Sequence, residues 1–123
     1  TFTETFDSDN AFASNTFTVP SGEAGKYYVS LHIRVQSVGN DIVIATIKNG
    51  STQALFGRNE FNSTNYGLFS HGSIMISGIL DLSVGDTLTA QVYGKTFDAS
   101  ATTIQGNSNG SETWFHGYKL IGV

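Results

Sequence analysis

The three histidines, His32, His71 and His116, are the side chains of this sequence best suited to carry protons near neutral pH. Hydrolysis would require one of them to be held beside a nucleophile and an oxyanion donor. His32 falls on the outward register of an expected strand, and His71 precedes Gly72 in an expected turn. We therefore predict no catalytic residue and no enzyme; the alternative is a small hydrolase that depends on His71 or His116.

Two carboxylates in "DSD", Asp7 and Asp9, could offer oxygen ligands to a calcium ion. The EF-hand pattern is missing, because no glycine stands at its sixth position and no glutamate at its twelfth. A solvated turn accounts better for this pair, and no grouping of His, Asp and Glu has the spacing of a transition-metal site. We predict no metal and no cofactor, and keep Asp7 and Asp9 as the calcium candidates.

Composition excludes two classes of partner. Only 13% of the 123 residues are charged, against a typical share of about 25%, and the net charge is −4. The six lysines and arginines are scattered, so we expect no phosphate-binding surface and no nucleic-acid partner. No apolar run approaches the ~20 residues of a membrane span, so we predict no membrane insertion. The length suits one domain, residues 1–123.

The elements that must position these residues are strands, because apolar and polar residues alternate through much of the chain. The alternating segments are 27–35, 72–82, 86–93 and 113–121. The dipeptide "NG" at 49–50 predicts a hairpin turn between strands 41–48 and 51–56. No segment has the 3.6-residue period of a helix, so the pattern predicts an antiparallel sandwich or barrel of about eight short strands.

Four segments, in matching order, resemble the globular head of complement C1q, within the tumour-necrosis-factor-like jelly rolls. They are "FTVPSGEAGKYYVSLHIRV" (17–35), "IKNG" (47–50), "LDLSVGDTLTAQVY" (80–93) and "FHGYKLI" (115–121). Positions that match the family pattern include Phe17, Val19, Pro20, Gly25, Tyr27, Gly85, Asp86, Leu88, Phe115, Gly117, Tyr118 and Leu120. The segment 6–16 is shorter than its counterpart in the family, and there is no collagen Gly-X-Y tract.

The resemblance implies an all-β fold, an antiparallel two-sheet jelly-roll sandwich of about eight to ten strands that assembles as a homotrimer. Members of the family bind proteins, glycans or other surface ligands through exposed loops, and they are not enzymes. Related jelly rolls serve as bacterial surface proteins, phage fibre tips and capsid decorations.

Some expected strands carry aromatic residues on both faces, as in Tyr27 with Tyr28 and Phe115 with Tyr118. An apolar outer face must be covered, and in a two-layer sandwich another subunit can cover it. The predicted trimer contacts are Tyr28, Tyr93, Phe115 and Tyr118. The alternative is a carbohydrate platform on which these rings stack against sugars.

Two polar segments, 57–67 and 97–112, are expected to be loops that contact a ligand. The candidate residues are Arg58, Asn59, Phe61, Asn62 and Tyr66 in the first segment, and Asn107 and Asn109 in the second. Solvated connections would explain both compositions equally well.

We therefore expect a non-enzymatic homotrimeric module on the virion surface or in an extracellular position. The lack of cysteine, the low charge and the abundance of Ser, Thr, Asn and Gly favour a phage structural protein, a capsid decoration or a fibre tip. Residues 1–16 would then contact a capsid or fibre protein. The alternative is a lectin-like or receptor-binding head that recognises glycans or host-surface proteins through its loops.

Overall fold

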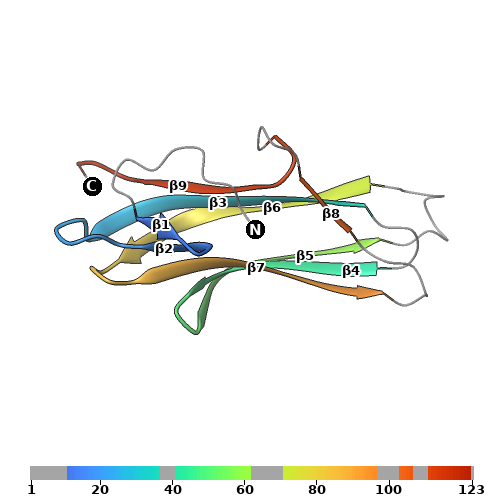
Figure 1. Ribbon diagram of the computed structural model, residues 1–123, viewed down its shortest axis with the longest axis horizontal. Coiled ribbons are helices and arrows are strands. Elements are labelled where there is room, and N and C mark those ends of the chain that lie inside the picture. The colour runs from blue at the N-terminus through green and yellow to red at the C-terminus, as the bar shows by residue number, and fades with distance from the viewer. Residues whose placement is uncertain (1–10, 37–40, 62–70, 97–102, 107–110, 123) are drawn as a thin grey trace.

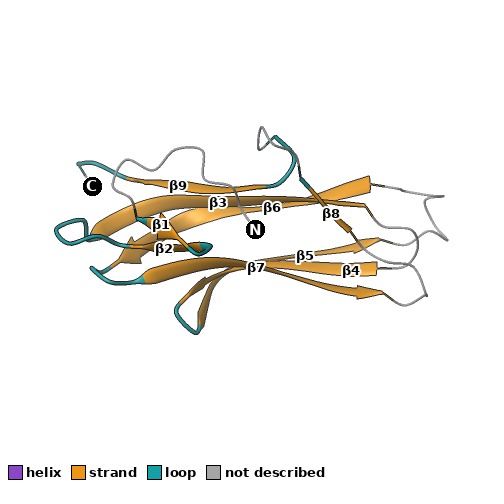
Figure 2. Ribbon diagram, viewed as in Figure 1, coloured by secondary structure: helices purple, strands orange, loops and turns teal. Residues whose placement is uncertain are grey.

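A computed structural model describes residues 11–36, 41–61, 71–96, 103–106 and 111–122, which form strands and their connections without any helix. Nine antiparallel strands form two sheets packed face to face, a β-sandwich, as the alternating sequence predicted (Figure 1, Figure 2). The strands are β1 (Phe12–Ala13), β2 (Thr16–Thr18), β3 (Gly25–Gln36), β4 (Asp41–Asn49), β5 (Thr52–Phe61), β6 (His71–Leu82), β7 (Thr87–Thr96), β8 (Thr103–Gln105) and β9 (Trp114–Lys119).

The two sheets are built from strands distant in sequence. One sheet has the order β1-β2-β7-β4-β5. In the other, β6 pairs with one edge of β3, while β8 and β9 share the opposite edge of β3. Figure 1 shows β9, β3 and β6 as one layer and β7, β5 and β4 as the other. The long strand β3 is therefore the centre of its sheet, and it organises the face described below.

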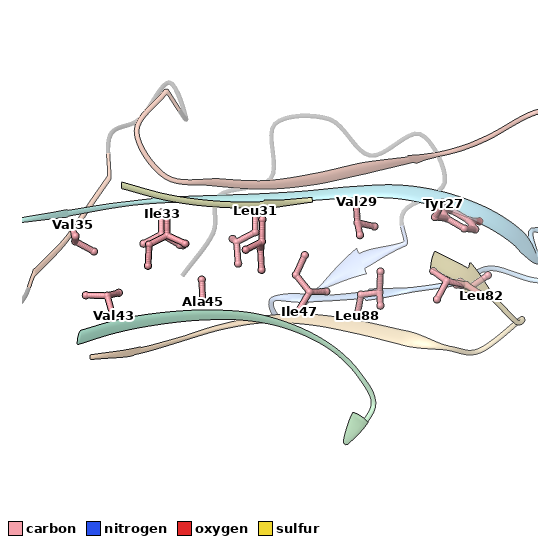
Figure 3. Packing of buried hydrophobic residues seen from close by; sticks show 13 residues of the cluster. Tyr27, Val29, Leu31, Ile33, Val35, Val43, Ala45, Ile47, Leu82 and Leu88 are labelled. Atoms are coloured by element: carbon pink, nitrogen blue, oxygen red, sulfur yellow. The ribbon is translucent and has the colours of Figure 1, made fainter. Parts of the chain in front are cut away.

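The core lies between β3 and β4. The odd positions of β3, from Tyr27 to Val35, point inward and are all at most 6% exposed. They face Val43, Ala45 and Ile47 of β4, each 0% exposed, across the interior (Figure 3). Burial of an aliphatic side chain of this size contributes ~1.5–3 kcal/mol. The predicted inward positions of 27–35 are confirmed, and the even positions of β3 must consequently face outward.

Two glycines let the sheets interlock at β5 and β6. A Cβ atom added to Gly57 of β5 would collide with the Ile76 side chain of β6. A Cβ atom added to Gly78 of β6 would lie 2.8 Å from Leu55 Cδ2 of β5. Ile76 therefore packs over Gly57, and Leu55 packs over Gly78, each at a position where the other sheet has no side chain. Such complementary packing brings the two sheets close together.

A single carboxylate holds the turn between β6 and β7. Asp86 Oδ2 accepts hydrogen bonds from the Ser83 backbone N–H at 3.0 Å and from Asn49 Nδ2 at 3.1 Å. These two bonds, the first the stronger influence, lower the pKa of Asp86. Gly85 supplies the positive φ of 84° that the turn needs. The alternating segments 72–82 and 86–93 are therefore joined by a turn, and Asn49 ties it to the end of β4.

The β4–β5 hairpin is displaced by one residue from its predicted position. Asn49 pairs with Thr52, so the two loop residues are Gly50 and Ser51 rather than Asn49 and Gly50. Gly50 adopts the positive φ, 57°. Asn49 stays in strand geometry opposite Leu88, where its side chain reaches Asp86.

Candidate functional site

The outer side of the sheet formed by β6, β3 and β9 carries a group of large, weakly polar side chains. Pairing across β3 places its outward residues in three rows with those of β6 and β9. We call these nine residues the aromatic face: Tyr28, Ile79 and Tyr118 in the first row, Ser30, Ser77 and His116 in the second, and His32, Met75 and Trp114 in the third.

Several side chains of the aromatic face are exposed although they are apolar. Met75 is 59% exposed, and Ile79 and Tyr118 are each 61% exposed. The rings of Tyr28 and Tyr118 lie with their centroids 5.3 Å apart. Isolated exposed apolar residues are ordinary, but neighbouring ones in one patch mark a contact surface.

Trp114 lies in contact with two imidazole rings. Its ring is stacked on His32 with centroids 5.4 Å apart, and His116 lies 4.2 Å from it. His32 Nδ1 is 2.7 Å from the backbone carbonyl oxygen of Glu112. A carbonyl oxygen can only accept, so Nδ1–H is the donor and the neutral ring keeps Nε2 free of a proton. This bond fixes the orientation of His32 within the stack.

The middle row contains a buried hydroxyl. Ser30 is 1% exposed despite its outward register, and its Oγ has no hydrogen-bond partner within the described part of the chain. Its cross-strand neighbours are Ser77 and His116. A buried polar group without a partner costs about 1–3 kcal/mol. The aromatic face therefore keeps an unused hydrogen-bonding group near its centre.

Among the described residues, charges next to the aromatic face lie at its two ends. Lys26 Nζ lies 3.3 Å from Asp81 Oδ2 at one end, and Arg34 Nη1 lies 2.5 Å from Glu112 Oε1 at the other. None of the nine residues between these ion pairs is Asp, Glu, Lys or Arg. An uncharged centre with a charged rim is the composition of protein–protein interfaces.

The four predicted trimer contacts do not share one surface. Tyr28 and Tyr118 both belong to the aromatic face. Phe115 lies on the inner side of β9, opposite Leu31, and packs against the core. Tyr93 is on the other sheet, in β7. The reason is geometric: three positions separate Phe115 from Tyr118, and an odd separation along a strand puts two side chains on opposite faces.

The sequence reasoning did not select Met75 and Ile79 as contact residues. A signal for them was present in the alternation of 72–82, because Ile74 and Ile76 share one face, which is buried, and Met75 and Ile79 fall on the other. An apolar residue at an outward position is the observation that could have identified them.

The outer side of the five-stranded sheet is different, and we call it the opposite face. Its exposed rings are Tyr93, 60% exposed, and Phe56, 50% exposed, on strands separated by β4. Thr46 lies between Gln91 and Phe56 in the pairing register, and its Oγ1 donates to the Gln91 carbonyl oxygen at 3.5 Å. An ion pair between Arg58 and Glu60 also belongs to this sheet.

The first part of the predicted ligand loop at 57–67 is a strand. Arg58, Asn59 and Phe61 lie in β5 and pair with β4, so the prediction that they belong to a loop is wrong. Arg58 is exposed on this edge strand, while Asn59 pairs with the buried Val43 and its Nδ2 donates to the Ser73 carbonyl oxygen at 3.3 Å. The remaining candidates, Asn62, Tyr66, Asn107 and Asn109, lie outside the described residues.

The three histidines do not form one group: His32 and His116 both contact Trp114 on the aromatic face, whereas His71 lies elsewhere. His71 lies in β6 opposite Gln36, not in the turn that was predicted. Asp7 and Asp9 lie outside the described residues. Within the residues that are described, no three His, Asp or Glu side chains form a group that could hold a metal ion.

One sequence pattern bears on catalysis. Residues 106–110 are Gly-Asn-Ser-Asn-Gly, the residue pattern of the nucleophile elbow found in some hydrolases. That elbow requires a strand before it and a helix after it. Here β8 precedes the pattern, but the chain resumes at 111–113 as a bend and continues into β9. The structural context of an elbow is therefore not found in the described chain on either side of 107–110.

Neither a protein-family model nor a curated protein matches this chain. Within the ranges given above, no helix is long and apolar enough to cross a membrane. Function must therefore be inferred from the surface of the molecule, and the aromatic face is its most distinctive part.

Proposed function

We propose that the protein is a non-enzymatic homotrimeric jelly-roll module displayed on a virion or outside a cell, and that its copies meet through the aromatic face. The observation that carries this proposal is the group of exposed apolar residues on that face, above all Met75, Ile79 and Tyr118, with no charged residue among its nine members.

The strand order supports a jelly roll in particular. The succession β2-β7-β4-β5 in one sheet and β9-β3-β6 in the other requires the chain to cross between sheets after β2, β3, β5, β6 and β7. Repeated crossing of this kind between two antiparallel sheets is how a jelly roll is wound.

A second copy of the chain is the occupant that best fits the aromatic face. Each end of the face carries an internal ion pair, Lys26 with Asp81 and Arg34 with Glu112, so the rim is electrically balanced and like-charge repulsion between copies is small. A closed ring of three copies, the assembly that the resemblance implies, would bury this face in every subunit.

The placement on a virion or outside a cell rests on composition. The chain has no cysteine, few charges and many Ser, Thr, Asn and Gly residues. With the resemblance to jelly rolls of phage particles, this favours a structural role as a capsid decoration or fibre tip, with residues 1–16 directed to a capsid or fibre protein.

A second candidate function is recognition of glycans or host-surface proteins. The exposed rings of Tyr93 and Phe56 on the opposite face favour it, since aromatic rings can stack against sugars. Both functions can coexist, because the opposite face stays accessible when copies meet through the aromatic face.

Sedimentation velocity across micromolar concentrations tests the proposal. We expect a species of three times the chain mass, which dissociates on dilution. A monomer throughout would contradict the assembly function, and a glycan array would then decide whether the second candidate stands alone.

A further inference from the structure

We propose that acid dissociates the assembly, because His32 and His116 must both be neutral for copies to pack through the aromatic face. This inference rests on the proposed function and specifies how that same surface is regulated. It assigns a role to the two histidines that neither the core nor any catalytic arrangement uses.

The histidines lie inside the contact surface, not at its edge. His116 shares the middle row with Ser30, and His32 shares the third row with Met75. Their rings flank Trp114, with centroids 5.4 Å and 4.2 Å from it. A copy that covers Trp114 must therefore also remove water from both imidazoles.

The described groups that face the two rings supply no free counter-ion. Next to His32 are Arg34 and Glu112, which already pair with each other at 2.5 Å. Next to His116 are the phenols of Tyr28 and Tyr118, and β6 presents Met75 and Ser77. A protonated imidazole enclosed among these groups would be a desolvated charge, compensated by the adjacent indole ring and, at His32, by the hydrogen bond to the Glu112 carbonyl oxygen.

Free chains have no such constraint. In the free chain water can solvate a charge on either ring, and imidazole is the side chain that most readily gains a charge in mild acid. A group that must stay neutral in the assembly weakens association about tenfold at one pH unit below its pKa. Two such groups weaken it about a hundredfold for each chain that joins the assembly, and the direction is fixed: association is strongest above neutral pH and weakens as the rings become protonated.

The test compares the concentration at which half of the chains are assembled at pH 7.5 and at pH 5.5, by sedimentation velocity on a dilution series. For the wild-type chain we expect this concentration to rise at least tenfold at the lower pH. The double variant His32→Gln with His116→Gln should assemble at pH 7.5 and shift less than twofold. Glutamine is uncharged and can still donate to the Glu112 carbonyl oxygen.

The third histidine supplies the matched control. His71 lies in β6 outside the aromatic face, so His71→Gln should shift with pH as the wild type does. His116 is exposed, so the single variant His116→Gln should fold even if the double variant does not, and it should lose about half of the logarithmic shift.

The fluorescence of Trp114 reports independently on protonation of His32 and His116, since Trp114 is the only tryptophan of the chain. Protonated imidazole quenches a neighbouring indole. The fluorescence of dilute, monomeric protein should fall as pH drops from 7.5 to 5.5, and the double variant should lose this titration. Fluorescence independent of pH would show that neither ring titrates against Trp114, and would overturn the proposal.

The remaining outcomes separate the two proposals. A wild-type chain that assembles equally well, or more tightly, at pH 5.5 overturns the switch and leaves the assembly function standing. A double variant that dissociates in acid as the wild type does assigns the effect to other groups and also overturns the switch. A monomer at pH 7.5 overturns both.

Discussion

The two outer faces of the sandwich have the same backbone geometry and comparable exposed apolar residues, yet their organisation differs. On the opposite face, Tyr93 and Phe56 are separated by β4, and Thr46 and Gln91 lie around them. On the aromatic face, rings contact one another within and between strands, and charges are confined to the ends. Clustering and lack of charge, rather than exposure of single residues, distinguish a surface suited to self-association.

The sharpest version of this comparison lies within one strand, since β9 has one side in the core and the other on the aromatic face. Phe115→Ser should destabilise the fold by about 3 kcal/mol, because it empties a position packed against the core. Denaturant unfolding of dilute protein measures it. Tyr118→Ser, at a side chain 61% exposed, should change the monomer's unfolding free energy by less than about 1 kcal/mol and release folded monomers.

The reverse result would break the comparison. If Tyr118→Ser unfolds the chain while Phe115→Ser leaves it folded and monomeric, the inner and outer sides of β9 have been assigned the wrong way round.

A charge placed on each face should affect assembly unequally. Ile79→Asp puts a carboxylate among Tyr28, Tyr118 and Ser77, where a neighbouring copy would have to bury it, so we expect a loss of at least ~2 kcal/mol, about thirtyfold or more, in association. Tyr93→Asp, at a similar exposed fraction on the opposite face, is the matched control and should assemble as the wild type does. Equal effects of the two changes in sedimentation velocity would remove the distinction between the faces.

Local sequence patterns predicted which residues of β9 lie on the same side of the strand. They did not predict which of the two sides faces the core. Alternation predicted that Trp114 and Tyr118 share one side of the last strand and Phe115 the other, and the structure confirms it. Both sides carry aromatic residues, so the pattern alone could not say which side meets the core. That depends on the pairing of Phe115 with Leu31, residues far apart in sequence, and no local period contains such information.

The extent of β5 shows a second limit of local patterns. The segment from Gly57 onward is rich in polar residues, which is typical of a loop, yet it continues as a strand to Phe61. Pairing with β4 and the insertion of Ile76 against Gly57 decide the outcome, and both are tertiary contacts. The same cause explains why Arg58 and Asn59 were wrongly placed in a loop.

The turn at Asp86 allows acid effects on the fold to be separated from acid effects on the aromatic face. Its hydrogen bonds with Ser83 and Asn49 hold its pKa below the usual aspartate value of about 3.9. A depressed folded-state pKa means that the contribution is complete above the unfolded value and is lost only as pH falls through the folded one. At pH 5.5 this turn should therefore be intact.

Replacing that carboxylate checks the separation. Asp86→Ala should lower the thermal unfolding temperature at pH 7 and flatten its fall in strong acid, because the variant has no carboxylate to protonate. Circular dichroism at pH 7, 5.5 and 3 measures this. Assembly of the folded variant should still depend on pH between 7.5 and 5.5; if it does not, the acid sensitivity of the assembly comes from the turn and not from His32 and His116.

The smallest expected effect is at Ser30. It tests whether the buried Ser30 hydroxyl gains a hydrogen-bond partner when copies assemble. Because Ser30 Oγ is buried without a partner in the described chain, Ser30→Ala removes an unsatisfied group and should leave the monomer equally stable or stabilise it by up to about 1 kcal/mol. If another copy supplies a partner atom on assembly, the same change should weaken association about threefold to tenfold. Ser77→Ala, in the same row but at an exposed serine, controls for the loss of a hydroxyl. A variant that is stabilised as a monomer and associates unchanged would mean that the hydroxyl stays unpaired under the contact, and that shape and apolar area alone hold the copies together.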